Sequence, residues 1–369
     1  MSVRAGDPPR RREHLDWLRG VAVIVMVLAH VSDAWTIDAD RARTLYLIVI
    51  FIAGLAAPLF LFMAGLTLSM ASAAKAATLG HAAAAATARR RGWQIFALAF
   101  IFRLQSQLLG WGPLINFLKV DILNIMGLSL IAAGGLWSVS AARAVRIAAF
   151  AFVTIAITMV TPLVREWALL APLPDAIEAY IRPIAGRTTF TIFPWSGFLF
   201  AGVIAGELVA AARTEPAELK LHAGLLAAGA AGIALGYWAS FQPSIYPVAN
   251  FWTSSPTFFF IKLGIATVLL PIARAIDLFH QLVLKWRGWE PGTVITTLGR
   301  ASLFVYWIHL EMVYGVIGRP LRRLLPLEAS LTATAVLCLI LYAIVRWRDR
   351  AIQGRELPRA LRILTPILR

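Results

Sequence analysis

Ten stretches of mostly apolar residues recur along the chain, and they constrain its fold more than any other feature. They cover approximately residues 17–37, 44–73, 92–110, 121–138, 147–165, 190–212, 221–241, 257–278, 293–316 and 328–346. A helix needs roughly 20 apolar residues to cross the hydrocarbon core of a bilayer. Hydrophobic residues make up 59% of the chain, and its mean hydropathy is +0.74. We therefore expect an all-α integral membrane protein, a bundle of about ten transmembrane helices.

The basic residues are distributed unevenly among the segments that join these stretches. Of the 35 Lys and Arg residues, 23 lie in the N-terminal segment and in the loops and tail on its side, nine lie in the opposite loops, and three lie within spans. Because cytoplasmic loops carry an excess of Lys and Arg, we expect both termini in the cytoplasm. This topology accounts for the net charge of +16, and we expect no nucleic-acid partner.

The apolar stretches leave no room for a separate soluble domain. We expect a single transmembrane domain over residues 1–369, with a basic cytoplasmic N-terminus at 1–16 and a basic cytoplasmic tail at 347–369. The start of the chain has the basic and apolar regions of a signal peptide. Nine further apolar stretches follow it without a convincing cleavage site, so we expect it to stay as the first span.

Cysteine and histidine usage argues against disulfides and metal centres. The one cysteine, Cys338, lies inside the last apolar stretch, so no disulfide framework is available. Two histidines, His30 and His309, lie within spans. Glu311 points about 160° away from His309 on a helix that turns about 100° per residue. Because no carboxylate accompanies these histidines at ligand spacing, we expect no metal ion.

The most informative polar residues interrupt the first apolar stretch, GVAVIVMVLAHVSDAWT. Arg19, His30 and Asp33 fall on one face of a helix, and His30 lies about 16 Å beyond Arg19 at 1.5 Å per residue. Ionisable groups at membrane depth are costly and are usually kept for a function or a buried partner. We expect His30 and Asp33 to point into the bundle in its outer half, with Arg19 near the cytoplasmic boundary.

This topology places further polar residues at the depth of His30. They are Arg103, Gln105, Gln107, Asp121, Asn124, Trp195, Ser196, Lys262, His309 and Glu311. From this set we select Asp121, Asn124, Trp195, Lys262 and His309 as candidate substrate-binding residues. Structural alternatives remain for three of them: an N-cap for Asp121, interfacial anchoring for Trp195, and packing near a helix end for His309.

Five motifs follow one another between about residue 10 and residue 316: LDWLRGVAVIVMVLAHVSDAWT, APLFLFMAGLTLS, DILNIMGLSLI, FPWSGFLFAGVIAG and LGRASLFVYWIHLE. Together they resemble the bacterial members of the heparan-alpha-glucosaminide N-acetyltransferase-like family of multi-pass membrane acyltransferases. The first motif is also similar to the acyltransferase-3 type of membrane O-acyltransferase. The resemblance implies transfer of an acyl group, typically acetyl from cytoplasmic acetyl-CoA, to a sugar amine or hydroxyl across the inner membrane of a bacterium.

One departure from this family concerns the catalytic histidine. Lysosomal relatives carry their proposed catalytic His shortly after the first helix, whereas IDADRARTLY contains none here. Either His30 takes that role or the site is altered. His30 can serve as the base or the nucleophile that acyl transfer needs, and Asp33 can fix its tautomer.

Two arginines toward the cytoplasm, Arg19 and Arg300, are candidates for binding the phosphates of acyl-CoA through bidentate contacts. For Arg19 the alternative is a boundary arginine that sets the orientation of the first span. No metal takes part in this scheme. The only small-molecule requirement is acetyl-CoA as the acyl donor.

Two function classes remain open at this point. The first is an acyltransferase that acts on an extracytoplasmic glycan or glycolipid; the second is a transporter or flippase for a glycan, lipid or organic anion that uses the same inward polar residues without chemistry. An internal repeat would favour transport, and none is evident. His30 and Asp33 can also belong to a buried network that only holds helices together. A homo-oligomer is compatible with each alternative.

Overall fold

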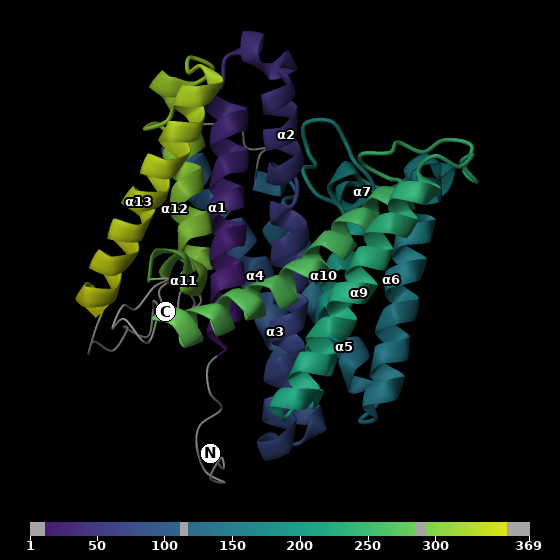
Figure 1. The fold of residues 1–369 in the computed structure, drawn as a ribbon. Coiled ribbons are helices and arrows are strands. Elements are labelled where there is room, and N and C mark those ends of the chain that lie inside the picture. Colours follow the sequence, from purple (N-terminus) through teal and green to yellow (C-terminus); the bar gives the residue numbers. More distant parts are fainter. Residues whose placement is uncertain (1–11, 111–116, 285–292, 353–369) are drawn as a thin grey trace.

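The computed structural model describes residues 12–110, 117–284 and 293–352, and all regular secondary structure in these ranges is helical. The predicted all-α class is therefore confirmed. Most of the long helices run between two ends of a bundle (Figure 1), with the N-terminus of α1 at the lower end in that view. Isolated backbone bridges join Thr36 to Leu325 and Val120 to Thr188.

Thirteen α-helices follow one another in the described residues. They are α1 (Glu13–Trp35), α2 (Thr44–Ala53), α3 (Ala56–Leu79), α4 (His81–Gly110), α5 (Ile122–Ser138), α6 (Arg143–Glu166), α7 (Asp175–Ile181), α8 (Ile192–Ala211), α9 (Glu215–Ala239), α10 (Pro256–Phe279), α11 (Thr293–Arg300), α12 (Ser302–Tyr314) and α13 (Leu327–Ile352). Each of the ten predicted ranges contains helix.

Seven helical segments in the described ranges are long and apolar enough to cross a membrane. They are α1, the continuous stretch of α2 and α3, α6, α8, α9, α10 with its extension to Leu282, and α13. The predicted count of about ten is not confirmed. One reason is length, because α5 has only 17 residues. Another is a break at Ala301, which divides the range 293–316 into α11 and α12.

Helix α1 packs closely against α11, and two glycines make this contact possible. A Cβ atom on Gly20 would lie 1.9 Å from the carbonyl oxygen of Ile295, and one on Gly299 would lie 1.9 Å from that of Asp16. Only a residue without a side chain allows backbones to approach so closely. This contact sets Arg300, the last residue of α11, beside the first turns of α1.

Four glycines within the apolar stretches, Gly54, Gly65, Gly202 and Gly206, are expected from the sequence to be close-packing positions between helices, and the structure supports this at three of them. Gly65, Gly202 and Gly206 lie where α3 and α8 meet, and a Cβ atom at each would lie within 2.4 Å of a backbone oxygen of the other helix. Gly54 is different. It ends α2 at the break before α3, and the atoms nearest to its Cβ position are oxygens of its own helix at 3.3 Å.

The far end of α1 is fixed to α12 and α13 by hydrogen bonds. The indole Nε1 of Trp35 donates to the carbonyl oxygen of Val313 at 3.1 Å, and the hydroxyl of Thr36 donates to that of Ser330 at 3.0 Å. Both bonds are buried, where a satisfied polar pair favours one arrangement of the helices. They hold the second half of α1 beside the last turns of α12.

Candidate functional site

A large cavity of about 1340 Å³ lies inside the bundle beside α1. Basic side chains line the end that adjoins the N-terminus of α1: Arg19, Lys75, Arg90, Arg91, Arg300 and Arg348. The lining at the opposite end includes His30, Asp33, Arg103, Lys119, Asp121, Tyr314 and Arg319. The cavity therefore extends along α1 from the level of Arg19 to the level of His30.

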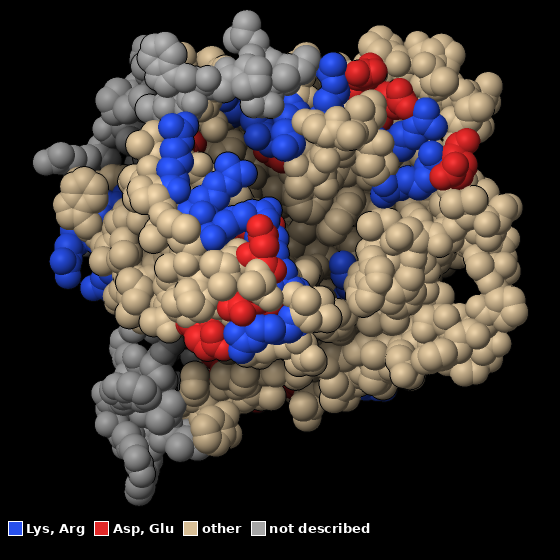
Figure 2. Space-filling view, turned by 90° about the horizontal axis from the view of Figure 1, so that it is seen from above, with Lys and Arg blue, Asp and Glu red and all other residues tan. Residues whose placement is uncertain are grey.

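The second end of the cavity lies on the face seen in Figure 2. A hollow near the middle of this face is bordered by Lys and Arg side chains, with acidic groups beside several of them. Charged groups of both signs at one mouth suit a polar ligand more than an apolar one.

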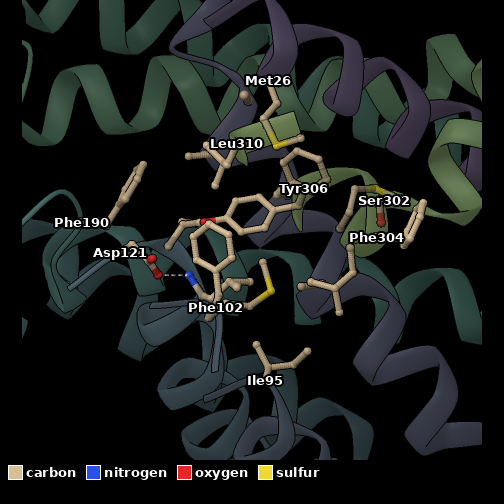
Figure 3. A pocket seen from close by; sticks show the side chains of 18 of the residues that line it. Met26, Ile95, Phe102, Asp121, Phe190, Ser302, Phe304, Tyr306 and Leu310 are labelled. Atoms are coloured by element: carbon tan, nitrogen blue, oxygen red, sulfur yellow. Dashed lines mark hydrogen bonds between the residues drawn. The ribbon is translucent and has the colours of Figure 1, made fainter. Parts of the chain in front are cut away.

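Between its two ends, the cavity has mostly apolar walls. Phe102, Phe190, Phe304 and Tyr306 face a common space, with Met26 on one side (Figure 3). The rings of Phe102 and Tyr306 lie 5.9 Å apart between centroids. Apolar walls with charged groups at either end are typical of sites that bind an elongated, amphipathic ligand.

His30 belongs to a hydrogen-bonded chain with Tyr314 and Asp33. Its Nδ1 atom lies 3.1 Å from the hydroxyl oxygen of Tyr314, and that hydroxyl donates to Oδ2 of Asp33 at 3.0 Å. The α12 residue Tyr314 thus stands between the two α1 residues. The predicted role of Asp33 in fixing the His30 tautomer requires correction on one point, because the contact runs through Tyr314.

This chain determines which nitrogen of His30 carries the proton. A carboxylate only accepts hydrogen bonds, so the Tyr314 hydrogen is directed at Asp33. The Tyr314 oxygen is then left to accept from His30, which places the imidazole proton on Nδ1. In neutral imidazole the other nitrogen, Nε2, carries a lone pair. His30 lines the cavity, so this lone pair belongs to a residue of the cavity wall.

His309 lies beside His30 but outside the cavity wall. The two imidazole centroids are 5.2 Å apart, the side chain of His309 is fully buried, and its Nδ1 lies 2.8 Å from the carbonyl oxygen of Val305. The residue does not line the cavity. Direct substrate contact by His309 is therefore not supported, and its position is that of a packing neighbour of His30.

Asp121 lines the cavity and is also the N-cap of α5. Its carboxylate accepts hydrogen bonds from the backbone nitrogens of Leu123 at 3.0 Å and Asn124 at 3.4 Å, while the Asn124 side chain accepts from the Asp121 nitrogen at 3.1 Å. This is a capping box. Asp121 also pairs with Arg103 at 2.8 Å, so one carboxylate starts the helix and holds a cation at the cavity wall.

Asn124 is turned away from the cavity. Its side-chain nitrogen donates to the Tyr180 hydroxyl at 3.2 Å, and burial raises the pKa of that phenol. Trp195 does line the cavity, whereas Lys262 does not. The Lys262 ammonium lies 5.8 Å from the Trp195 ring centroid and 4.2 Å from that of Phe258, so its contacts are with aromatic faces.

Both candidate arginines for acyl-CoA line the cavity, and a buried carboxylate positions them. Asp16 is 4% exposed, and it lies 3.4 Å from Arg19 and 3.4 Å from Arg300. Sequence reasoning selected these two arginines because of their depth. It missed Arg90, Arg91 and Arg348, which were assigned only to cytoplasmic segments. Their place at the cytoplasmic ends of two apolar stretches, directly before 92–110 and after 328–346, was the signal that could have found them.

The described residues include one group of three side chains that could hold a metal ion: His14, Glu218 and His222. None of the three lines the cavity.

The fold and the cavity define a class: a multi-pass helical membrane protein with an internal cavity lined by ionisable groups. A family model described as heparan-alpha-glucosaminide N-acetyltransferase, catalytic, matches residues 11–243, which is more than half of the chain. The chain belongs to this family, and the resemblance stated from its motifs is confirmed. The match ends before α10, so the fifth motif lies outside it. No curated protein matches the chain.

Proposed function

We propose that this protein transfers an acetyl group from acetyl-CoA on the cytoplasmic side to an amine or hydroxyl of a sugar on the other side of the membrane. One observation carries the proposal: a single cavity has six basic residues at one end and the His30, Tyr314 and Asp33 chain at the other. Membership of an N-acetyltransferase family supports the reaction class.

The basic end of the cavity suits the donor. Coenzyme A carries three phosphates, and arginine side chains bind phosphate through paired hydrogen bonds. Arg19 and Arg300 are held side by side by Asp16, and Arg90 and Arg91 face them from α4. The apolar middle of the cavity then accepts the pantetheine arm, which points the thioester toward His30.

His30 has the geometry of a base. In the proposed reaction the acceptor nitrogen or oxygen attacks the thioester carbonyl carbon while His30 Nε2 takes its proton. The carbon–sulfur bond breaks, and the leaving thiolate receives that proton to become free CoA. While His30 is protonated, Nδ1 keeps its hydrogen bond to Tyr314, and the negative charge of Asp33 stabilises the imidazolium.

The same nitrogen can instead act as a nucleophile. Nε2 would then attack the thioester, release CoA and carry the acetyl group as an acyl-imidazole until the sugar accepts it. The two routes differ in one observable. Only the second releases CoA before any acceptor is added.

We also propose the membrane topology that this reaction requires. Ten spans, with α4, α5 and the broken pair α11 and α12 added to the seven long apolar segments, bring both termini to the cytoplasm. The membrane is the cytoplasmic membrane of a bacterium, and the acceptor is a glycan or glycolipid on its outer side. A transporter or flippase finds no specific support in the cavity or in the family match.

The test is acetyl transfer by purified protein in lipid vesicles, with labelled acetyl-CoA and an amino sugar as acceptor. We expect transfer by the unaltered protein and none by His30→Ala, with His280→Ala as the matched control because His280 does not line the cavity. Release of CoA without acceptor would select the nucleophilic route. Equal transfer by His30→Ala and unaltered protein, at equal folded amounts, would end the assignment of His30.

A further inference from the structure

A second cluster of ionisable side chains lies where α1, α9 and α10 meet, outside the cavity. His14 comes from the first turn of α1, and Glu218 and His222 come from α9. The side chains of His14 and His222 are 2% and 5% exposed. Their rings lie 5.9 Å apart between centroids at an angle of 83°. One ligand atom from each of the three residues lies within 4.8 Å of the other two.

Three nitrogens of this cluster are buried without a hydrogen-bond partner among the described residues: Nε2 of His14 and both ring nitrogens of His222. A buried polar atom that loses its contacts with water is costly unless something replaces them. Three ring nitrogens without a hydrogen bond, on two buried imidazoles that face each other, therefore indicate a missing ligand rather than ordinary packing.

The donor set matches one class of ligand. Two imidazole nitrogens and one carboxylate oxygen form the three-residue set that binds Zn²⁺ in many proteins, whereas Ca²⁺ and Mg²⁺ require oxygen ligands. Glu218 and His222 are four residues apart, so they lie on one face of α9. The Glu218 oxygen Oε1 is 3.8 Å from Nε2 of His222. Closure to the separation in a tetrahedral site, about 3.3 Å for bonds of about 2.0 Å, is a small movement.

A second layer of residues orients these ligands. Asp277 of α10 lies 3.8 Å from Nδ1 of His14, which favours a proton on Nδ1 and leaves Nε2 for a metal. Arg12 donates to Glu218 at 3.1 Å, and Arg274 donates to Asp277 at 3.0 Å. A carboxylate behind a ligating histidine and hydrogen-bond donors behind a ligating carboxylate are the usual supports of a zinc site.

The guanidinium groups of Arg12 and Arg274 lower the affinity that the cluster is expected to have for a divalent ion. Arg12 and Arg274 offset the charges of Glu218 and Asp277, so a divalent ion adds its full charge to the cluster. This electrostatic cost is the same for every divalent ion at the site, so only an ion that gains enough from imidazole nitrogen offsets it, which again favours Zn²⁺ over Mg²⁺ and Ca²⁺.

We propose that His14, Glu218 and His222 bind one zinc ion, with water as the fourth ligand, and that this ion fastens the start of α1 to α9. The site is separate from the acetyl-transfer chemistry, because none of its residues lines the cavity. Its effect is on the stability of the bundle. The proposal does not depend on the proposed function.

The test uses full-length protein in detergent, without a polyhistidine tag and after treatment with a chelator. After zinc is added back and the unbound metal is removed, we expect one zinc ion per chain by elemental analysis, and a rise in melting temperature on addition of Zn²⁺ but not of Mg²⁺ or Ca²⁺. Added Co²⁺ should give the strong visible absorption of a four-coordinate ion. This spectroscopic measurement on unaltered protein needs no variant to fold.

The variants are His222→Gln and Glu218→Gln, which keep similar volume and polarity, with His280→Ala as the control. We expect each ligand variant to lose more than about tenfold in zinc affinity, given that even a supporting residue is worth 10- to 100-fold, and the control to lose none. Failure of the unaltered protein to bind zinc, or a zinc-induced stabilisation that persists in both ligand variants, would overturn the proposal.

Discussion

At the scale of single residues, the central feature is a tyrosine that lies between a histidine and an aspartate. The spacing of His30 and Asp33 suggests direct contact, but i,i+3 neighbours on a helix do not always bond. Tyr314, 284 positions after His30, fills the space between them. In the proposed mechanism its hydroxyl transmits the charge of Asp33 to the imidazole and fixes the tautomer that leaves Nε2 free to act as the base.

Tyr314→Phe removes only the hydroxyl of this chain. We expect the turnover number for acetyl transfer to fall about tenfold to 100-fold, because a hydrogen bond that involves a charged group contributes about 1.5–3 kcal/mol. The KM for acetyl-CoA should stay within twofold to threefold, since Tyr314 lies at the other end of the cavity from the basic residues. Steady-state kinetics on folded protein measure both.

Asp33→Asn provides the comparison for that variant. It keeps the shape of the side chain but removes the charge, and we expect a similar loss of turnover. The double variant should be scarcely slower than either single variant if the two residues act through one chain. Additive losses would show that Tyr314 and Asp33 act separately.

Arg300→Ala tests the basic end of the cavity. We expect about a tenfold loss in affinity for acetyl-CoA, since one charge-assisted contact to a phosphate is removed. Calorimetric titration of the binding-competent protein measures this, and Arg213→Ala is the control because Arg213 does not line the cavity. The assignment of donor phosphates to this end would be wrong if Arg300→Ala bound acetyl-CoA as tightly as the control.

At the scale of helices, the contact between α1 and α11 builds the basic end of the cavity. Gly299 precedes Arg300 and packs against the backbone of α1 at Asp16, the residue that also pairs with Arg19 and Arg300. The position of the arginines therefore depends on this backbone contact as well as on their ion pairs with Asp16.

Gly299→Ala should disturb this contact, because its Cβ atom would lie 1.9 Å from a carbonyl oxygen that belongs to α1. Overpacking of this kind costs about 1–3 kcal/mol. We expect a lower melting temperature together with weaker binding of acetyl-CoA. Gly135→Ala is the control, since nothing lies within 4 Å of its Cβ position, and it should leave both measurements unchanged. If Gly299→Ala behaved like this control, the close packing of α11 would not matter for the donor site.

The helices could be predicted from the sequence because apolar length is a local property. All ten predicted ranges contain helix, and the depth of Arg19 relative to His30 follows from the rise of one helix. The break near Gly54 has a signal in the sequence, since Pro58 cannot donate a hydrogen bond to the Gly54 carbonyl four residues earlier, whereas no proline marks the break at Ala301. The contacts between distant side chains could not be predicted either, because Tyr314 reaches His30, and His14 reaches His222, only through tertiary packing.

The candidate site could also be predicted only in part from the sequence. The sequence argument placed His30, Asp33, Asp121 and Trp195 at one depth, and in the structure all four line one cavity. The depth of a residue does not indicate whether its side of the helix borders that cavity. Asn124, Lys262 and His309 lie at the same level but face neighbouring helices.

At the scale of the whole molecule, the arrangement requires that successive loops alternate between the two sides of the membrane. Reporter proteins fused after residues 80 and 215 should report the cytoplasm, and fusions after residues 40 and 170 should report the outside. The uneven distribution of Lys and Arg is the physical reason. A single fusion that reported the opposite side would mean that one of the ten predicted spans does not cross the membrane. The side assigned to every later loop would then be reversed.

The cavity also predicts different access to its two ends. Cys338 is the one cysteine of the chain, and it is only 8% exposed, so an introduced cysteine can be labelled selectively by a charged maleimide. Arg91→Cys, at the basic end, should react only when the reagent reaches the cytoplasmic face, and acetyl-CoA should protect it. Lys119→Cys, at the other end, should react only from outside.

Acetyl-CoA should leave the rate at Lys119→Cys unchanged, because its phosphates bind at the level of Arg19 and Arg300, about 16 Å below His30 for the 11 intervening steps along a helix. An amino-sugar acceptor should have the opposite pattern, slowing the reaction at Lys119→Cys and not at Arg91→Cys. Protection of both positions by one ligand, or reaction of both from the same side, would mean that the cavity does not separate donor from acceptor. The proposed transfer across the membrane depends on that separation, since the pantetheine arm enters the aromatic middle of the cavity and only the acetyl group is passed on to the acceptor at the other end.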